Sequence, residues 1–174
     1  MHVSGKLALL TSLLTIGAAG SSGAVELKPC FTPDQDCTDF IVRQIDGAKS
    51  ELLVQAYGFT SAPIIQAIGR AKERGLDVNV ILDKTNEQKR YTGATYLVNH
   101  GINPLIDDKV AIAHNKVIVI DSRAVITGSF NFTQAAQTKN AENVLLIEDD
   151  LTLVKAYAVN WKQRAAVSRP LALQ

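Results

Sequence analysis

Residues 113–121 read Ala-His-Asn-Lys-Val-Ile-Val-Ile-Asp. The run from Val117 to Ile120 consists of β-branched residues only, and it predicts a strand that is apolar on both faces. Such a strand has no face for solvent, so we expect it in the middle of a sheet with helices on both sides. This stretch therefore predicts a layered α/β architecture.

The rest of the chain fits that architecture. Hydrophobic periodicity and capping residues predict helices at residues 38–49, 61–74, 86–100 and 151–165, and strands at 51–57, 76–82, 102–106, 110–120, 124–127 and 143–147. Helices and strands alternate in the first half, whereas the second half is a run of strands with a closing helix. The prediction is an α/β fold with a mixed central β-sheet flanked by helices on both faces.

The first residues have a different composition from the rest. Lys6 is the only formally charged side chain before Val25, an apolar run extends from Leu7 to Ile16, and small residues follow to Ala24. This order predicts a signal peptide over residues 1–24, cleaved after Ser22 or Ala24. An uncleaved anchor is the alternative, but the run is shorter than the about 20 residues of a membrane-spanning helix.

The mature chain is then a single domain over residues 25–174, periplasmic or secreted and without stable membrane insertion. The whole sequence has 18 Lys and Arg against 17 Asp and Glu, and removal of Lys6 leaves it formally neutral. An anionic partner must therefore be bound by a local cluster of basic residues and not by the global charge.

Cys30 and Cys37 are the only cysteines. A short loop containing Pro33 separates them, and disulfides persist in the expected compartment, so we predict a Cys30–Cys37 bridge, with two free thiols as the alternative. Their spacing is not that of a Cys-x-x-Cys redox site. Together with the few scattered histidines they do not form a zinc ligand cluster, so no metal site is expected.

The polar chemistry concentrates around residue 114. On a regular strand, His114 and Lys116 project from the same face, which sets an imidazole beside an ammonium. Asp121 has the opposite parity at the far end of the strand, so it cannot touch His114. Its expected work is structural, either holding a turn or pairing with Arg123.

A second polar pair, Ser129 and Asn131, alternates with phenylalanines in the stretch Gly-Ser-Phe-Asn-Phe-Thr of residues 128–133. If this segment is extended, both polar side chains share a face while the phenyl rings pack on the other. Lys116 would supply charge, Asn131 would supply N–H donors, and His114 could attack phosphorus or shuttle a proton. A hydrogen-bonded structural histidine explains His114 alone, but the complete set favours an anion site with a nucleophile.

These residues resemble a known family. The spacing His114-x-Lys116-x(4)-Asp121, followed by Gly128-Ser129-x-Asn131, is similar to the signature of the phospholipase D superfamily. With a signal peptide, a single copy of the motif and a short mature chain, the sequence resembles the single-motif bacterial endonucleases of that superfamily. The resemblance implies a metal-independent hydrolase without a cofactor.

The resemblance also implies roles. His114 would attack the phosphodiester to form a phosphohistidine, while Lys116 and Asn131 hold the phosphate oxygens. Glu142 matches the family acid that orients the imidazole through its other nitrogen. Ser129 would hold the reacting residues in place without contacting the substrate, and Asp121 would support the motif structurally. Without the resemblance, Glu142 could equally be a solvated carboxylate at a strand start.

The histidine count predicts an assembly. Phosphohistidine chemistry needs one imidazole to attack and a second to protonate the leaving oxygen. The mature chain offers only His114 and His100, and His100 is expected to cap a helix end. The second His114 would then come from a second subunit, so we expect a two-fold homodimer that shares one active site.

The substrate is the least determined part. Lys84, Lys89 and Arg90, together with Lys109, Lys116, Arg123 and Lys139, are candidates for tracking the backbone phosphates of DNA or RNA, which predicts nonspecific cutting. The basic run at residues 84–90 could instead be the solvated face of a helix.

Three alternatives remain open. A phospholipase D-type lipid phosphodiesterase would act on the same bond, although no aromatic-rich amphipathic helix for lipid docking is evident. A non-catalytic phosphate-binding module would not need a nucleophile with an orienting acid. A metal-dependent nuclease would need clustered ligands, whereas the adjacent pairs Asp107-Asp108 and Asp149-Asp150 point to opposite faces of a strand.

Overall fold

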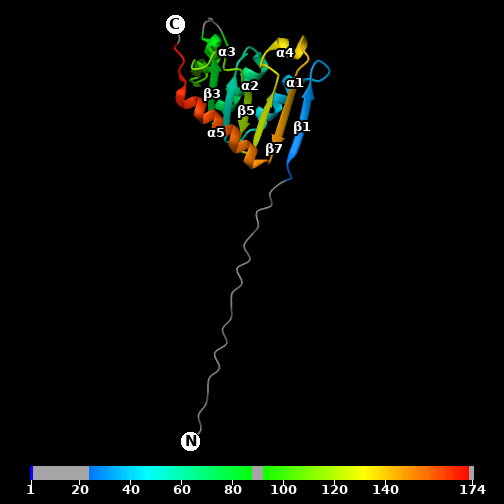
Figure 1. The fold of residues 1–174 in the computed structure, drawn as a ribbon, viewed down its shortest axis with the longest axis vertical. Helices are drawn as coiled ribbons and strands as arrows, with labels where there is room; N and C mark the ends of the chain where they lie inside the picture. Colours follow the sequence, from blue (N-terminus) through cyan, green and yellow to red (C-terminus); the bar gives the residue numbers. More distant parts are fainter. Residues whose placement is uncertain (2–23, 88–91, 173–174) are drawn as a thin grey trace.

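The computed structural model describes Met1 and residues 24–87 and 92–172. Over these residues the chain forms one eight-stranded sheet in the order β1-β7-β6-β5-β2-β3-β4-β8, with five α-helices and the short 3-10 helix η1 (Figure 1). Most of the predicted signal peptide, residues 2–23, lies outside the described residues, as do Lys89 and Arg90.

The strands are β1 (Glu26–Phe31), β2 (Glu51–Ala56), β3 (Asp77–Asp83), β4 (Leu105–Asp107), β5 (Lys116–Ile120), β6 (Ala124–Gly128), β7 (Asn143–Glu148) and β8 (Arg169–Pro170). The helices are α1 (Cys37–Gly47), α2 (Ala62–Glu73), η1 (Lys84–Asn86), α3 (Gly93–Asn99), α4 (Gln134–Thr138) and α5 (Leu151–Val167).

The sheet is mixed, as predicted. Strands β2, β3 and β4 are parallel, whereas β5 is antiparallel to both of its neighbours, β2 and β6. Every residue of β5 is buried. The apolar run at 117–120 therefore occupies the interior of the sheet, which confirms the expectation drawn from its two apolar faces.

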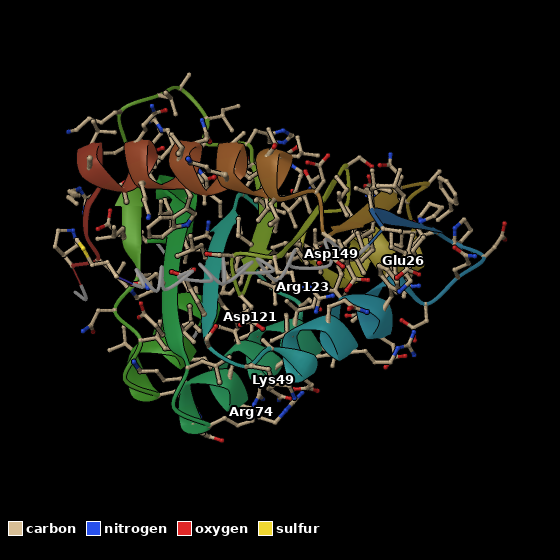
Figure 2. All side chains as sticks on the ribbon, turned by 90° about the horizontal axis from the view of Figure 1, so that it is seen from below. Glu26, Lys49, Arg74, Asp121, Arg123 and Asp149 are labelled. Atoms are coloured by element: carbon tan, nitrogen blue, oxygen red, sulfur yellow. A yellow bond between two sulfur atoms is a disulfide. The ribbon has the colours of Figure 1, made fainter. Side chains whose placement is uncertain are left out.

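Helices cover both faces of the sheet. Ile118 and Ile120 face a core formed with α1, α2 and α3, while Val117 and Val119 face a smaller core formed with α5. Figure 2 shows α5 along one face and α1 and α2 along the opposite face. Trp161 of α5 packs in the smaller core and donates its indole N–H to the main-chain oxygen of Val54 at 2.9 Å. This architecture is the predicted one.

Three predicted elements are wrong in extent. The strand predicted at 102–106 is β4 and begins only at Leu105. The strand predicted at 110–120 begins only at Lys116, because residues 109–112 are exposed and the N–H of Ala113 donates to the Asp83 carboxylate instead of a neighbouring strand. Of the helix predicted at 86–100, residues 88–91 lie outside the described residues, and the described part contains the end of η1 and the shorter α3. Thr92 begins α3, since its side chain accepts a hydrogen bond from the N–H of Thr95 at 3.4 Å.

Besides the 3-10 helix η1, three elements were not predicted: β1, α4 and the two-residue strand β8, which pairs with β4. Strand β1 pairs only with β7 at the edge of the sheet, is mostly exposed and contains Pro29. An edge strand of this kind lacks both the apolar alternation and the full set of N–H donors that mark a strand in a sequence. Helix α4 spans only Gln134–Thr138, too short for a periodic pattern.

The predicted disulfide is present. Cys30 and Cys37 are bonded, and the bridge joins β1 to the beginning of α1. Among the described residues, no helix is both long enough and apolar enough to cross a bilayer.

Asp121 holds a turn, which was one of its two expected roles. Asp121 and Ser122 have φ values of 52° and 51° in the tight turn between β5 and β6. The Asp121 carboxylate accepts hydrogen bonds from the N–H groups of Lys49, Ser50 and Glu51 and from the Ser50 hydroxyl, at 2.7 to 3.2 Å. It therefore fixes the beginning of β2 against the end of β5.

The other expected role of Asp121, pairing with Arg123, is wrong. Arg123 pairs with Asp149, which follows β7, with Arg123 Nε 2.5 Å from Asp149 Oδ1. Figure 2 shows Arg123 near Asp149 and Asp121 near Lys49. The main-chain bond from the N–H of Asp149 to the oxygen of Arg123, at 3.1 Å, brings these two loops together.

Replacing Asp121 with alanine is expected to lower the free energy of unfolding by about 2–3 kcal/mol, because several main-chain donors lose a charged acceptor. Burial alone would raise the pKa of Asp121, but its hydrogen bonds outweigh burial and lower the pKa below the ordinary value of 3.8. The ionised carboxylate therefore stabilises the protein above about pH 4, and this contribution is lost as the pH falls through the lowered pKa.

Urea unfolding of the wild type and Asp121→Ala at neutral pH and at pH 3 or below measures both effects. The difference between the two proteins should be large at neutral pH and should shrink in acid. Asp77→Ala, which removes an exposed carboxylate from the start of β3, is the matched control. An equal loss in the two variants would contradict the role given to Asp121.

Candidate active site

His114 lies in the loop that joins β4 to β5, and it is exposed. Its imidazole packs against the phenol ring of Tyr57, with ring centroids 4.6 Å apart and the planes tilted by 55°. The next residue, Asn115, accepts a main-chain hydrogen bond from the N–H of Tyr57 at 3.0 Å. The end of β2 therefore supports the histidine through both a side chain and the main chain.

Lys116 is the first residue of β5 and pairs in register with Ala56 of β2. Only 7% of it is exposed, although its side chain carries a formal charge. Its Nζ donates to the main-chain oxygen of His114 at 2.9 Å and lies 5.5 Å from the centroid of the Tyr57 ring. The histidine and the lysine therefore share Tyr57 as a neighbour, although His114 lies in the loop before β5 and not on the strand predicted for it.

Burial gives Lys116 an unusual electrostatic position. Desolvation lowers the pKa of Lys116 from its ordinary value of 10.5, and the negative charge of Glu142 partly opposes this. The ammonium has one hydrogen bond to a main-chain oxygen among the described residues, so it retains donors for an anion. A phosphate oxygen would add a negative charge in direct contact with this buried group.

Asn131 lies in the segment after β6, and this segment is not the regular extended one considered from the sequence. Phe130 and Phe132 are buried in the larger core, as predicted, while Ser129 lies in a bend. Asn131 packs against Gly58, where an added Cβ would lie 3.2 Å from the Asn131 Cβ. The Oδ1 of Asn131 is buried and has no hydrogen-bond partner among the described residues.

Glu142 precedes β7 and has both carboxylate oxygens occupied. Its Oε2 accepts a hydrogen bond from the Ser129 hydroxyl at 2.6 Å, and its Oε1 accepts one from the Asn140 side chain at 2.8 Å. Its own N–H donates to the Thr32 hydroxyl at 3.0 Å. Within the described single chain no hydrogen bond joins Glu142 to His114, so the role of Glu142 as the orienting acid stays a prediction.

Ser129 connects Glu142 to β7, because its hydroxyl also accepts a hydrogen bond from the N–H of Asn143 at 3.0 Å. The preceding residue must be glycine. Gly128 has a φ of 148°, and an added Cβ would lie 2.2 Å from the main-chain oxygen of Asn143. Gly128 therefore lets the chain pass close to β7, and this brings the Ser129 hydroxyl within hydrogen-bond distance of the Glu142 carboxylate.

Replacing Ser129 with alanine is expected to lower kcat about tenfold, because Glu142 loses its shortest hydrogen bond and with it a fixed orientation. The free energy of unfolding should fall by about 1 kcal/mol. Thr138→Ala is the matched control, since the Thr138 hydroxyl donates to Gln134 within α4, away from Glu142. Steady-state kinetics on a soluble phosphodiester checks this, and equal rates for the two variants would contradict it.

The structure thus brings His114 and Lys116 together, joins Ser129 to Glu142, and lets the charge of Glu142 act on Lys116. Asp121, which the sequence placed among the catalytic candidates, lies at the opposite end of β5 from Lys116 and contacts residues 49–51. Its contribution to the site is to fix the strand that carries the lysine.

The basic residues expected to bind backbone phosphates have different partners and lie in different parts of the fold. Lys84 lies in η1 and donates to the main-chain oxygen of Val110 at 3.1 Å, so it is attached to the loop that leads to His114. Lys109 pairs with Asp108 at 3.1 Å, and Lys139 caps the end of α4. Arg123 is engaged in the distant turn with Asp149. Lys89 and Arg90 lie outside the described residues.

The remaining candidates have structural partners. His100 is the C-cap of α3, donates from Nδ1–H to the main-chain oxygen of Tyr96 at 2.8 Å, and stacks on the Tyr96 ring, which confirms a helix-end position. Asp107 pairs with Arg164, and Asp108 pairs with Arg169. Over the residues that the structure describes, no group of three or more His, Cys, Asp and Glu side chains could hold a metal ion.

Sequence reasoning missed Tyr57 and Gly58. Both follow β2, and the antiparallel pairing of β2 with β5 sets them beside His114, Lys116 and Asn131. The only available signal was position, since polar or small residues at the end of a buried strand often line a site. Without the strand order, the position of Tyr57 and Gly58 at the end of a strand could not assign them to the site that contains His114.

Comparisons with known proteins identify similar sequences. The family model described as "Cardiolipin synthase, PLD-like domain" matches residues 41–164. The chain is 45% identical over 141 residues to a phospholipase D of Rickettsia conorii, covering 81% of this chain and 70% of that protein. It is 30% identical over 122 residues to the mitochondrial cardiolipin hydrolase of Mus musculus, covering 70% of this chain and 55% of that protein.

A solved structure is similar to this chain in its fold. The crystal structure of Nuc from Salmonella typhimurium, a phospholipase D family member, superposes with a TM-score of 0.80 at 32% sequence identity. The match covers 87% of this chain and all of that one. The similarity therefore extends over nearly the whole described domain.

Proposed function

Since the chain belongs to the phospholipase D superfamily of phosphodiesterases, we propose that it is a nonspecific endonuclease that hydrolyses DNA through a phosphohistidine at His114. One observation carries the proposal: an exposed imidazole lies beside a buried ammonium, and both contact the same tyrosine ring. A nucleophile next to a desolvated cation fits attack on an anionic diester.

The first step forms a bond between an imidazole nitrogen of His114 and phosphorus, and it breaks the bond from phosphorus to the leaving oxygen. Lys116 donates to a non-bridging phosphate oxygen and offsets the charge that builds up there. Asn131 donates from its amide nitrogen to a second oxygen. A second imidazole protonates the leaving oxygen, so this product departs as an alcohol.

The second step hydrolyses the intermediate. The second imidazole, now neutral, takes a proton from water as the water oxygen attacks phosphorus, and the bond to His114 breaks. The products are a phosphate monoester and free His114. The carboxylate of Glu142, held by Ser129 and Asn140, supplies negative charge near Lys116 throughout.

The second imidazole is the His114 of a second subunit in a two-fold homodimer. Support comes from the described chain itself, because His100 is committed to the end of α3. Co-expression of wild-type chains with His114→Ala chains tests this. Shared sites predict that activity falls below the fraction of wild-type chains, whereas activity proportional to that fraction would contradict a shared site.

DNA is the favoured substrate because the fold and the length match those of Nuc, whose whole chain is covered. A lipid phosphodiester is the second candidate, and it is favoured by the relatives named phospholipase D and cardiolipin hydrolase. Both substrates present the same reacting group, so the site chemistry alone does not separate them. RNA would be cut by the same chemistry.

The experiment is incubation of the purified mature protein in excess EDTA, in parallel with supercoiled plasmid and with vesicles that contain cardiolipin. Plasmid nicking that persists in EDTA and disappears in His114→Ala is expected. Loss of nicking in EDTA would contradict a metal-independent reaction. Release of lipid products without nicking would replace the nuclease with the lipid hydrolase.

Location is part of the same proposal. Residues 1–24 are proposed to direct the chain across the inner membrane, where the Cys30–Cys37 bridge persists. Mass spectrometry of the protein recovered from the periplasmic fraction should give a mature chain that begins near Gly23 or Val25. Recovery of the full-length chain in the membrane fraction would instead indicate an uncleaved anchor.

A further inference from the structure

Asp83 is a buried carboxylate that the mechanism above does not use. It ends β3, next to β2 in the sheet, and only 1% of it is exposed. One of its oxygens accepts a hydrogen bond from the N–H of Thr85 at 2.9 Å, and the other accepts one from the N–H of Ala113 at 2.8 Å. The carboxylate thus joins two segments that are far apart in the sequence.

The second of these segments leads directly to the nucleophile. Ala113 immediately precedes His114, and it is buried while the four residues before it are exposed. On the other side, the main-chain oxygen of Asn115 accepts a hydrogen bond from the N–H of Tyr57. The main chain around His114 is therefore held at Ala113 by the Asp83 carboxylate, at Asn115 by the N–H of Tyr57, and at His114 itself by Lys116 Nζ.

We infer that Asp83 is a positioning residue that sets the main chain at His114, on the premise of the proposed function that His114 is the nucleophile. The loop from Asp108 to Asn115 has no regular secondary structure, and at Ala113 the main-chain N–H is fixed by its hydrogen bond to Asp83. In-line attack on phosphorus tolerates little displacement, since a shift of about 1 Å can cost about 10²-fold in rate.

The two hydrogen bonds that Asp83 accepts require a carboxylate at this position and not merely a polar side chain. Two main-chain N–H groups point at two different oxygens, which only an ionised carboxyl presents at the same time. An asparagine side chain of the same shape offers one oxygen, and its amide N–H would face the remaining donor. Burial opposes ionisation, but the hydrogen bonds from Thr85 and Ala113 keep the pKa of Asp83 below its ordinary value.

The test compares Asp83→Asn with Asp107→Asn. Asp107 is an equally buried carboxylate at the end of the adjacent strand β4. It accepts hydrogen bonds from Arg164 of α5 and from the N–H of Lys109, which lies at the start of the loop, five residues before His114. Both variants lose a buried charged hydrogen-bond set, so both should unfold at a lower temperature. Kinetics with bis(4-nitrophenyl) phosphate, below both melting temperatures, separate a loss of stability from a loss of positioning.

The expected result is a kcat about ten- to hundredfold lower in Asp83→Asn with KM within about twofold, because Lys116 and Asn131 still bind the diester. Asp107→Asn should keep both constants near those of the wild type. Equal kcat values in the two variants would overturn the inference. If Asp83→Asn does not fold, Asp83→Ser removes the carboxylate without an opposing amide and replaces it in the same comparison.

A second readout does not depend on activity. The mature chain has only His100 and His114, so their imidazole resonances can be assigned with a His100→Gln variant. Asp83→Asn should shift the His114 resonances and leave those of His100 unchanged. Unchanged His114 resonances would overturn the inference even if turnover had fallen. If His114→Ala remained active, the proposed function would fail, while this readout would still report whether Asp83 sets His114.

Discussion

Replacing His114 with alanine is expected to reduce phosphodiester hydrolysis by at least about 10⁴-fold, because the attacking atom itself is removed. In a shared site the same substitution also removes the group that protonates the leaving oxygen. Since His114 is exposed and its ring packs against Tyr57, the free energy of unfolding should change by less than about 1 kcal/mol.

Single-turnover rates of the wild type, His114→Ala and His100→Gln check this prediction. His100→Gln is the matched control, because it removes the other histidine of the mature chain from the end of α3. It should lower the melting temperature slightly and leave the rate unchanged. A large rate loss in His100→Gln, or an active His114→Ala, would show that the nucleophile has been assigned to the wrong residue.

Replacing Lys116 with methionine is expected to lower kcat by about 10²- to 10³-fold, the effect typical of removing one donor that stabilises transition-state charge. Stability should be unchanged or higher, because the methionine fills the same buried space without the desolvation cost of an ammonium. A loss of activity together with a gain in stability is the signature of a charge kept for function.

The comparison uses kcat and urea unfolding, with Lys155→Met as the control on the exposed surface of α5. Lys155→Met should keep the wild-type rate. For the wild type, the lowered pKa of Lys116 also predicts that the rate falls with rising pH at a midpoint below 10.5, the ordinary value for lysine. A fully active or an unfolded Lys116→Met would contradict the role assigned to this residue.

The central part of the fold could be predicted because burial leaves a direct mark on the sequence. Residues 117–120 are apolar on both faces and form the interior strand β5, and α2 is marked by Pro63 in its first turn and by Gly75 after its end. The failures lie where long-range contacts decide. Ala113 leaves the strand because a carboxylate on β3 takes its N–H, and β1 exists only through its pairing with β7.

The site divides in the same way. His114, Lys116, Ser129, Asn131 and Glu142 could be named because their spacing resembles a family signature. Tyr57 and Asp83 could not, because both reach His114 through the sheet order β5-β2-β3, which the sequence does not reveal. The pattern indicates which groups react, whereas the residues that hold them are recognised only from the fold.

The most direct test of the central claim is the stereochemical course of cleavage. An oligonucleotide with a single-configuration phosphorothioate is cut in heavy-oxygen water, and the configuration at phosphorus in the product is determined. Attack by His114 followed by attack of water makes two in-line displacements, so we predict retention of configuration. Inversion would require a single displacement by water and would contradict a phosphohistidine intermediate.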